Sequence, residues 1–391
     1  MKIIIPFFIV LLILTVVSCK PRTPKRDLKN DTLSKNDTGL IKNPYDTFSY
    51  GAYDEIACFL AGKLPQGKPE YLYKHFKKDS WKNYSVQFSA TWEGYRKSVI
   101  SEVQQWSGEH LQYGDTIFYP FSGPDFNYLN AMFPKASYAV MIGLEKTGSI
   151  PEPDTISGDS ITKYLASVNK ALYFNLKLSF FRTKSMRNEL DNDMVNGTIP
   201  LIMLFMNRHG KYIVNINPIE INAKGELQVT DTANEFAYNF RKKFDYGVEF
   251  VYRDSGDVTL KKLVYLSLDL SNDGLDTDAK KTFVSSMAHR NTVFMKAASY
   301  LCFIGAFTNI RDAILNNAAQ IVTDPSGMPY IHLRKKWNVD LYGEYTGPIN
   351  LFKGFKQPEL KADIDSLKPG KLPFIFGYHP SHWCMVVARR K

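Results

Sequence analysis

Large apolar side chains recur every three or four residues between positions 81 and 106, and this repeat constrains the fold more than any other feature of the chain. The residues that form it are Trp81, Tyr84, Phe88, Trp92, Tyr95, Val99, Val103 and Trp106. Residues with this spacing lie on one face of an α-helix. We therefore predict a long helix whose aromatic stripe packs into the core, in preference to a stripe that stacks on a ligand or lies on a membrane.

Helical and strand patterns are mixed along the rest of the chain. Other helices are predicted over 53–60, 71–77, 160–190, 277–303 and 311–321, together with a short helix that ends before Pro134. Apolar runs predict strands over 116–121, 138–144, 212–221, 226–229, 247–252, 260–270, 330–333, 372–378 and 383–388. Because these elements follow no regular βαβ rhythm, we expect an α+β fold with a mixed, mainly antiparallel sheet and a helix-rich N-terminal half.

The N-terminal residues have the pattern of an export signal. Lys2 precedes an apolar run of 15 residues, Ile3 to Val17, and Ser18 and Cys19 follow it. A positive charge, a short apolar core and small residues at its end are the parts of a secretory signal. The run is shorter than the roughly 20 residues that a membrane-spanning helix needs. We expect residues 1–18 to be removed on export.

Val16-Val17-Ser18-Cys19 resembles the lipobox of bacterial lipoproteins. The resemblance covers the first 19 residues and implies that Cys19 carries a lipid and becomes the N-terminus of a protein anchored in the cell envelope. More than one acyl chain makes such anchoring stable. The alternative is an ordinary signal peptide with a cysteine at its cleavage site. Lys20 is not the aspartate that retains lipoproteins in the inner membrane of enteric bacteria, so the outer membrane is favoured.

A polar segment separates this signal from the part that can fold. Residues 19–43 hold no aromatic side chain and cannot bury enough apolar surface to form a core, so we predict a flexible tether. Residues 44–391 are predicted to form a single large α+β domain, with a subdivision near residue 195 left open. The disordered tether would join the membrane anchor to this domain.

The net charge of +10 sits mostly outside the predicted domain. Lys2, residues 20–43 and the C-terminal residues 389–391 contribute eight of these ten charges. A protein that binds nucleic acid carries its positive charge on a folded face, so we expect no nucleic-acid partner. Attraction of the basic ends to anionic lipid headgroups is the preferred interpretation.

The cysteine and histidine patterns predict no metal and no cofactor. Cys58, Cys302 and Cys384 share no close spacing, which excludes a CxxC site, although an oxidising compartment permits one disulfide among them. His379 and His382 flank a Pro-Ser turn and lack a third ligand nearby. No Walker A loop, HExxH motif or dinucleotide fingerprint is present.

The segment 269–274 resembles the opening of a calcium loop. Asp269, Ser271, Asp273 and Gly274 occupy the expected places, but Lys280 stands where the bidentate glutamate belongs. We therefore interpret these residues as a strand-to-helix turn.

The turn Ser122-Gly123-Pro124-Asp125 joins a predicted strand to a predicted helix. It lacks the Gly-x-Ser-x-Gly pattern of a nucleophile elbow, since Phe121 precedes Ser122. Ser122 is expected to cap the helix and Asp125 to complement its dipole.

Arg290 is the first candidate for a ligand-binding residue. In a helix over 277–303 it would lie in the middle of an apolar face with Phe283 and Phe294. A guanidinium on a core-facing stripe needs a carboxylate or a bound anion. A buried ion pair is the structural interpretation, and the functional one is an anion site with Arg290 as its floor and Ser122 and Asp125 at its rim.

Three further segments resemble parts of uncharacterised bacterial envelope proteins: Phe118 to Asp125, Asp324 to Tyr330, and Trp337 through Tyr342 to Ile349. The resemblance implies no activity, but it suggests that the three loops form one surface. We expect a membrane-anchored envelope lipoprotein that binds an anionic or glycan ligand or assists envelope assembly.

The sequence does not decide between this binding module and an enzyme. The alternative is an envelope hydrolase acting on a cell-wall or glycan substrate, with Asp125 and Glu145 as its carboxylates. A purely structural lipoprotein would have no cleft and a fully paired Arg290.

Overall fold

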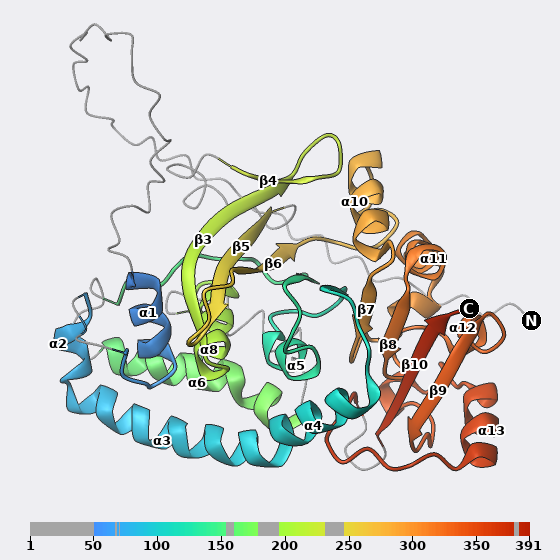
Figure 1. The fold of residues 1–391 in the computed structure, drawn as a ribbon, viewed down its shortest axis with the longest axis horizontal. Coiled ribbons are helices and arrows are strands. Elements are labelled where there is room, and N and C mark those ends of the chain that lie inside the picture. Colours follow the sequence, from blue (N-terminus) through green and yellow to red (C-terminus); the bar gives the residue numbers. More distant parts are fainter. Residues whose placement is uncertain are drawn as a thin grey trace, which may run out of the picture. The chain divides into compact units, whose positions relative to one another are not determined.

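Among the described residues, ten strands form one sheet at the centre of the computed structural model (Figure 1). The structure describes residues 51–66, 69, 71–153, 160–178, 195–230, 246–378 and 383–391. The strands are β1 Thr116–Tyr119, β2 Tyr138–Gly143, β3 Lys211–Ile221, β4 Leu227–Val229, β5 Tyr246–Asp254, β6 Lys261–Ser267, β7 Thr292–Met295, β8 Gln320–Thr323, β9 Trp337–Gly343 and β10 Cys384–Arg390. Their order in the sheet is β4-β3-β5-β6-β2-β1-β7-β8-β10-β9.

The five central strands, β6-β2-β1-β7-β8, run parallel to one another. Antiparallel pairing extends the sheet on both sides, through β5, β3 and β4 at one edge and through β10 and β9 at the other. The chain passes from β1 to β2 and β6 on one side and then returns to β7 and β8 on the other. This reversal makes the gap between the carboxyl ends of β1 and β7 a topological switch point, the usual place for a ligand in an open parallel sheet.

Helices cover both faces of the sheet. One group is α1 Ala52–Leu60, α2 Tyr73–Phe76, α3 Asp79–Tyr95, α4 Ser101–His110, α5 Phe126–Met132, α6 Ser160–Leu178 and α8 Ile199–Arg208. The other is α10 Asp278–Ala288, α11 Thr308–Asn317, α12 Tyr330–Leu333 and α13 Pro358–Leu367, with short 3₁₀ turns at Leu301–Phe303, Gly305–Phe307 and Asn350–Phe352.

Alternate residues of the central strands pack against the two helical layers. In β1, Ile117 and Tyr119 belong to the core under the first group of helices, and Phe118 belongs to the core under the second. This alternation follows from the two-residue period of a strand, and strands buried on both faces are typical of parallel sheets. The result is a three-layer arrangement of helices, sheet and helices.

The predicted aromatic stripe is confirmed. The helices α3 and α4 are joined without a break by the π-helical turn Arg96–Ile100 and follow one another along one side of the molecule (Figure 1). Trp81, Trp92 and Trp106 are between 3% and 6% exposed, so the stripe faces the core.

The predicted α+β class and mixed sheet are confirmed, with five antiparallel and four parallel pairings of strands. Three element predictions are wrong. The segment 277–303 is a helix only as far as Ala288, after which β7 begins at Thr292. Residues 330–333 form the short helix α12 instead of a strand, and no strand occurs over 372–378.

The structure tests the permitted disulfide, whereas several other predicted features lie outside the described residues. Cys58, Cys302 and Cys384 are free and buried, so none of them forms the disulfide that the sequence permits. Cys19, the tether, and the pair His379 and His382 lie outside the described residues. No helix within the described ranges has the length and apolar character needed to cross a membrane.

Candidate functional site

A cavity of about 620 Å³ lies at the carboxyl ends of the central parallel strands. Its walls come from the residues that follow β1, β2, β6 and β7, joined by the segment around the 3₁₀ turn Asn350–Phe352. Cavities of this size are typical of small-molecule sites. The position at the switch point between β1 and β7 is the one that the topology of an open parallel sheet favours.

The lining of this cavity, hereafter the main cavity, is mostly apolar. Its apolar members are Phe121, Ile142, Leu144, Leu268, Leu270, Ala297, Ala298, Leu301, Phe307, Ile349, Leu351 and Phe352. The polar members are Ser122, Glu145, Asp269, Ser299 and Tyr378. Among the described lining residues there is no lysine, arginine or histidine. The cavity therefore favours a neutral or cationic ligand with an apolar body over an anion.

Two glycines bring the loop after β1 and the end of β2 together beneath Glu145. A Cβ atom on Gly143 would lie 2.7 Å from Glu145 Oε2 and 2.8 Å from the Cα atom of Gly123. Gly123 has a φ of 53°, which glycine adopts without strain. Tyr265 fixes the same place from β6, since its hydroxyl donates to the backbone oxygen of Glu145 at 2.8 Å. Glu145 is only 7% exposed.

Backbone strain is concentrated around the cavity. Phe121, Ala297 and Ser299 have φ values between 53° and 60°, and all three line the main cavity. Tyr300 follows with a φ of 57°. Such conformations cost of order 1–3 kcal/mol each in a residue with a side chain, and they persist where the surroundings hold them.

The loop after β7 is held in this conformation by β8 and by Tyr378. The backbone N–H of Ala297 donates to Asp324 Oδ1 at 3.2 Å, and that of Ala298 donates to the hydroxyl of Ser326 at 2.9 Å. The hydroxyl of Tyr378 donates to the backbone oxygen of Ala297 at 2.5 Å and lies 2.8 Å from Ser299 Oγ. These contacts preorganise the wall that Ala297 and Ser299 present to the cavity.

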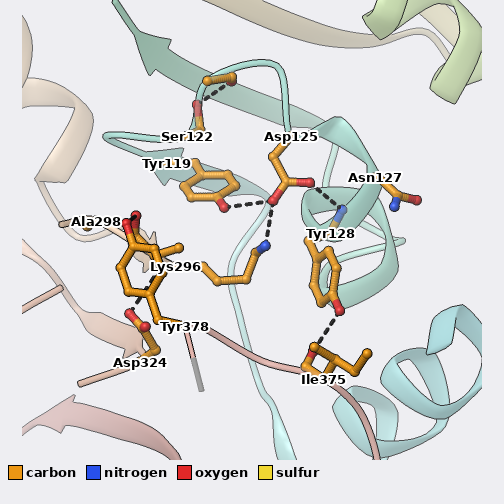
Figure 2. A network of polar contacts seen from close by, with 12 residues as sticks. Tyr119, Ser122, Asp125, Asn127, Tyr128, Lys296, Ala298, Asp324, Ile375 and Tyr378 are labelled. Carbon is orange, nitrogen blue, oxygen red and sulfur yellow. Dashed lines mark hydrogen bonds and ion pairs between the residues drawn. The ribbon is translucent and has the colours of Figure 1, made fainter. Parts of the chain in front are cut away.

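A buried ion pair lies below this wall (Figure 2). Lys296 Nζ and Asp125 Oδ2 are 2.9 Å apart, and their side chains are 0% and 3% exposed. Tyr119 donates to the same carboxylate oxygen at 3.1 Å, and the Lys296 ammonium lies 3.9 Å from the centre of the Tyr128 ring. The pair ties α5 to the end of β7 and so fixes two sides of the site.

Asp324 belongs to the same region. It is 2% exposed, and burial raises its pKa to about 6, against hydrogen bonds from Ser326 and the charge of Lys296, which lower it. Burial also raises the pKa of Tyr119 well above its usual value, with the charge of Asp125 acting in the same direction.

The capping role predicted for Ser122 is taken by Asp125, which lies at the start of the helix as predicted. Asp125 is the N-cap of α5, since Oδ1 accepts from the backbone N–H of Tyr128 at 3.2 Å. Ser122 does not cap the helix but donates to the backbone oxygens of Gly123 and Ile142 and lines the main cavity. Asp125, being held by Lys296, is not among the described residues of the cavity wall.

The prediction that Arg290 lies on a buried helix face is wrong. The helix α10 ends at Ala288, and Arg290 is exposed in the turn before β7, with a φ of 57°. Its backbone N–H donates to Asn317 at 2.9 Å. Since Arg290 precedes the first residue of β7 and the cavity follows the last, it cannot be the floor of that cavity. The argument for an anion site at Arg290 loses its basis.

The three loops singled out in the sequence do come together. Residues 121–123 line the main cavity, Asp324 and Pro325 line a second cavity, and the segment 345–349 reaches both through Ile349. Sequence reasoning missed Lys296 and Tyr378, although a lysine directly after a buried apolar run was a usable signal for the first. Within the described ranges, no group of three or more His, Cys, Asp or Glu side chains is placed to hold a metal ion.

Comparisons with known proteins add no relative: no protein-family model, curated protein or solved structure matches this chain.

Proposed function

We propose that the chain is a lipid-anchored binding module of the bacterial cell envelope whose main cavity takes one small organic ligand. Ligand binding is proposed because a mostly apolar cavity of about 620 Å³ lies at the switch point of the parallel sheet. The anchor part rests on the lipobox-like sequence that ends in Cys19.

The chemistry of the wall narrows the ligand class. Phe121, Phe307 and Phe352 offer aromatic surface to an apolar or ring-shaped body. Glu145 and Asp269 are acceptors, so the ligand's polar groups are hydroxyls or amines that donate to them. An anionic ligand would meet two carboxylates in this cavity and no described basic side chain, so we do not propose one.

Thermal unfolding of the full chain in a mild detergent tests this proposal. The panel comprises aromatic and aliphatic alcohols, the corresponding amines and carboxylates, and neutral cell-wall glycans. A ligand at about 100 times its dissociation constant adds roughly 2.7 kcal/mol to the free energy of unfolding. We expect clear shifts from alcohols or amines with an apolar body and none from the carboxylates. Shifts from the carboxylates alone would contradict the proposal.

A hydrolase is the second candidate, because Glu145 and Asp269 line the same cavity and glycoside hydrolysis uses a pair of carboxylates. The measurement is the release of reducing ends from cell-wall glycans. Release that disappears in both Glu145→Gln and Asp269→Asn would establish turnover. Release that survives either substitution would exclude this pair as the catalytic carboxylates. No release from any glycan would leave the binding module as the function.

A further inference from the structure

A second, small cavity of about 30 Å³ adjoins the main one. Ile349 and Tyr378 line both cavities, so the two cavities are neighbours at these side chains. A cavity needs roughly 10–15 Å³ of room for a water-sized sphere to hold one water molecule. The small cavity therefore has room for a small head group such as a primary ammonium.

Aromatic rings and one carboxylate make up much of the small cavity's wall. The aromatic residues are Tyr300, Tyr345, Phe376 and Tyr378. The carboxylate is that of Asp324, which is 2% exposed. Aromatic faces attract cations through their quadrupole, more strongly where water is excluded. No lysine, arginine or histidine occurs among the described lining residues.

Two carboxylates and one ammonium lie beside this cavity among the described residues. Lys296 Nζ lies 2.9 Å from Asp125 Oδ2, and its charge also acts on Asp324. A cation bound beside the buried Asp324 would meet an opposite charge where water is largely excluded.

We propose that the small cavity is the head-group subsite of the main cavity and binds a primary ammonium, so that the ligand is an amphipathic primary amine. Its ammonium lies between Asp324 and the rings of Tyr300 and Tyr345, and its apolar body passes Tyr378 into the main cavity. A phosphate-bearing amine is excluded, because neither described lining offers a basic side chain to the phosphate. This subsite rests on the proposed function and narrows its ligand class.

Calorimetric titration of the full chain at pH 7.5 with 2-phenylethylamine, 2-phenylethanol and 3-phenylpropionate tests the subsite. The three probes share one ring and differ in the head group. We expect the amine to bind at least tenfold more tightly than the alcohol, and the carboxylate to bind more weakly than either. This comparison requires no substitution and so does not depend on a variant that folds.

Two substitutions locate the head group. Asp324→Asn is expected to remove the tenfold preference for the amine, which is measured as the ratio of the amine and alcohol affinities within the same variant. Asp365→Asn, the same change at a residue that is 58% exposed and lines neither cavity, is expected to keep the preference. Equal affinities for amine and alcohol, a preference that survives Asp324→Asn, or one that is lost in Asp365→Asn would overturn the subsite while leaving the main cavity occupied. If neither the amine nor the alcohol binds, the proposed function fails as well.

Discussion

Lys296 and Asp125 form an ion pair in the interior of the protein, with 2.9 Å between Nζ and Oδ2 and almost no exposed surface on either side chain. The pair joins the end of β7 to the start of α5, the two segments that flank the switch point of the sheet. The pair therefore links two segments that lead into the candidate site.

Removal of one partner should be far more costly than removal of both. Lys296→Met leaves the buried Asp125 without its cation and is expected to lower the free energy of unfolding by about 3–5 kcal/mol. The double variant Lys296→Met/Asp125→Asn should recover a large part of this loss. Urea unfolding of the two single variants and the double variant gives the coupling energy.

The matched control is the exposed pair Lys361 and Asp365 on α13, whose side chains are 48% and 58% exposed. Lys361→Met should change the free energy of unfolding by less than about 1 kcal/mol. If the effects of Lys296→Met and Asp125→Asn on the free energy of unfolding are additive, the buried pair has no coupling energy and does not stabilise this part of the site.

Asp324 should make stability depend on pH in a definite direction. Its pKa in the folded state, about 6, lies above the ordinary value of 3.8, so the folded protein binds more protons than the unfolded chain between these values. The stability that Asp324 contributes in its protonated form is therefore lost as pH rises from about 4 to about 6, by up to roughly 3 kcal/mol. Among the described residues, the titratable groups that interact electrostatically with Asp324 include Lys296, Tyr119, Tyr300, Tyr378 and Cys384.

The measurement compares the free energies of unfolding of wild type and Asp324→Asn, obtained by urea unfolding at pH 4.5, 5.5, 6.5 and 7.5. Asparagine keeps an acceptor for Ala297 and Ser326 but does not ionise. We expect the free energy of unfolding of the variant to increase relative to that of wild type as pH rises to about 6. Above pH 6 the difference between the two free energies should stay constant. A difference independent of pH, or one of opposite slope, would contradict the raised pKa of Asp324.

The lipid anchor gives a prediction for the intact cell. Expressed in a bacterium that processes lipoproteins, the protein should enter the membrane fraction and incorporate a labelled fatty acid. Cys19→Ala should abolish the label, because the thioether cannot form without its sulfur. Cys58→Ala is the control, since Cys58 is buried in α1 and should not affect labelling. Label that persists in Cys19→Ala would refute the lipobox assignment.

The sequence predicts those parts of the fold in which one period dominates. The stripe from Trp81 to Trp106 is such a case, and its helix forms as predicted. The helix prediction for the segment that contains Arg290 failed because Phe294 continues the helical spacing of Phe283. In the structure, Thr292–Met295 is a short parallel strand that is buried on both faces. A run of four apolar residues fits both periods, and only pairing with β1 and β8 decides between them.

The candidate site was harder to predict than the fold. Ser122 and Glu145 could be named because they directly follow predicted strands, and both line the main cavity. The strained loop after β7 could not be predicted, since Ala297 and Ser299 adopt a positive φ without any glycine to signal it. Their conformation depends on Asp324 and Tyr378, which are brought close by the order of strands in the sheet and not by their distance along the chain.

Occupancy of the main cavity is the central claim, and a titration of three forms of the full chain with 2-phenylethylamine tests it most directly. Leu301→Trp adds bulk to the cavity wall, and Leu260→Trp makes the same change at a residue that is 57% exposed and outside that wall. We predict one saturable site in the wild type, the same affinity in Leu260→Trp, and at least a tenfold loss in Leu301→Trp at an unchanged midpoint of unfolding. Equal affinity in all three forms would place the ligand elsewhere and contradict the account.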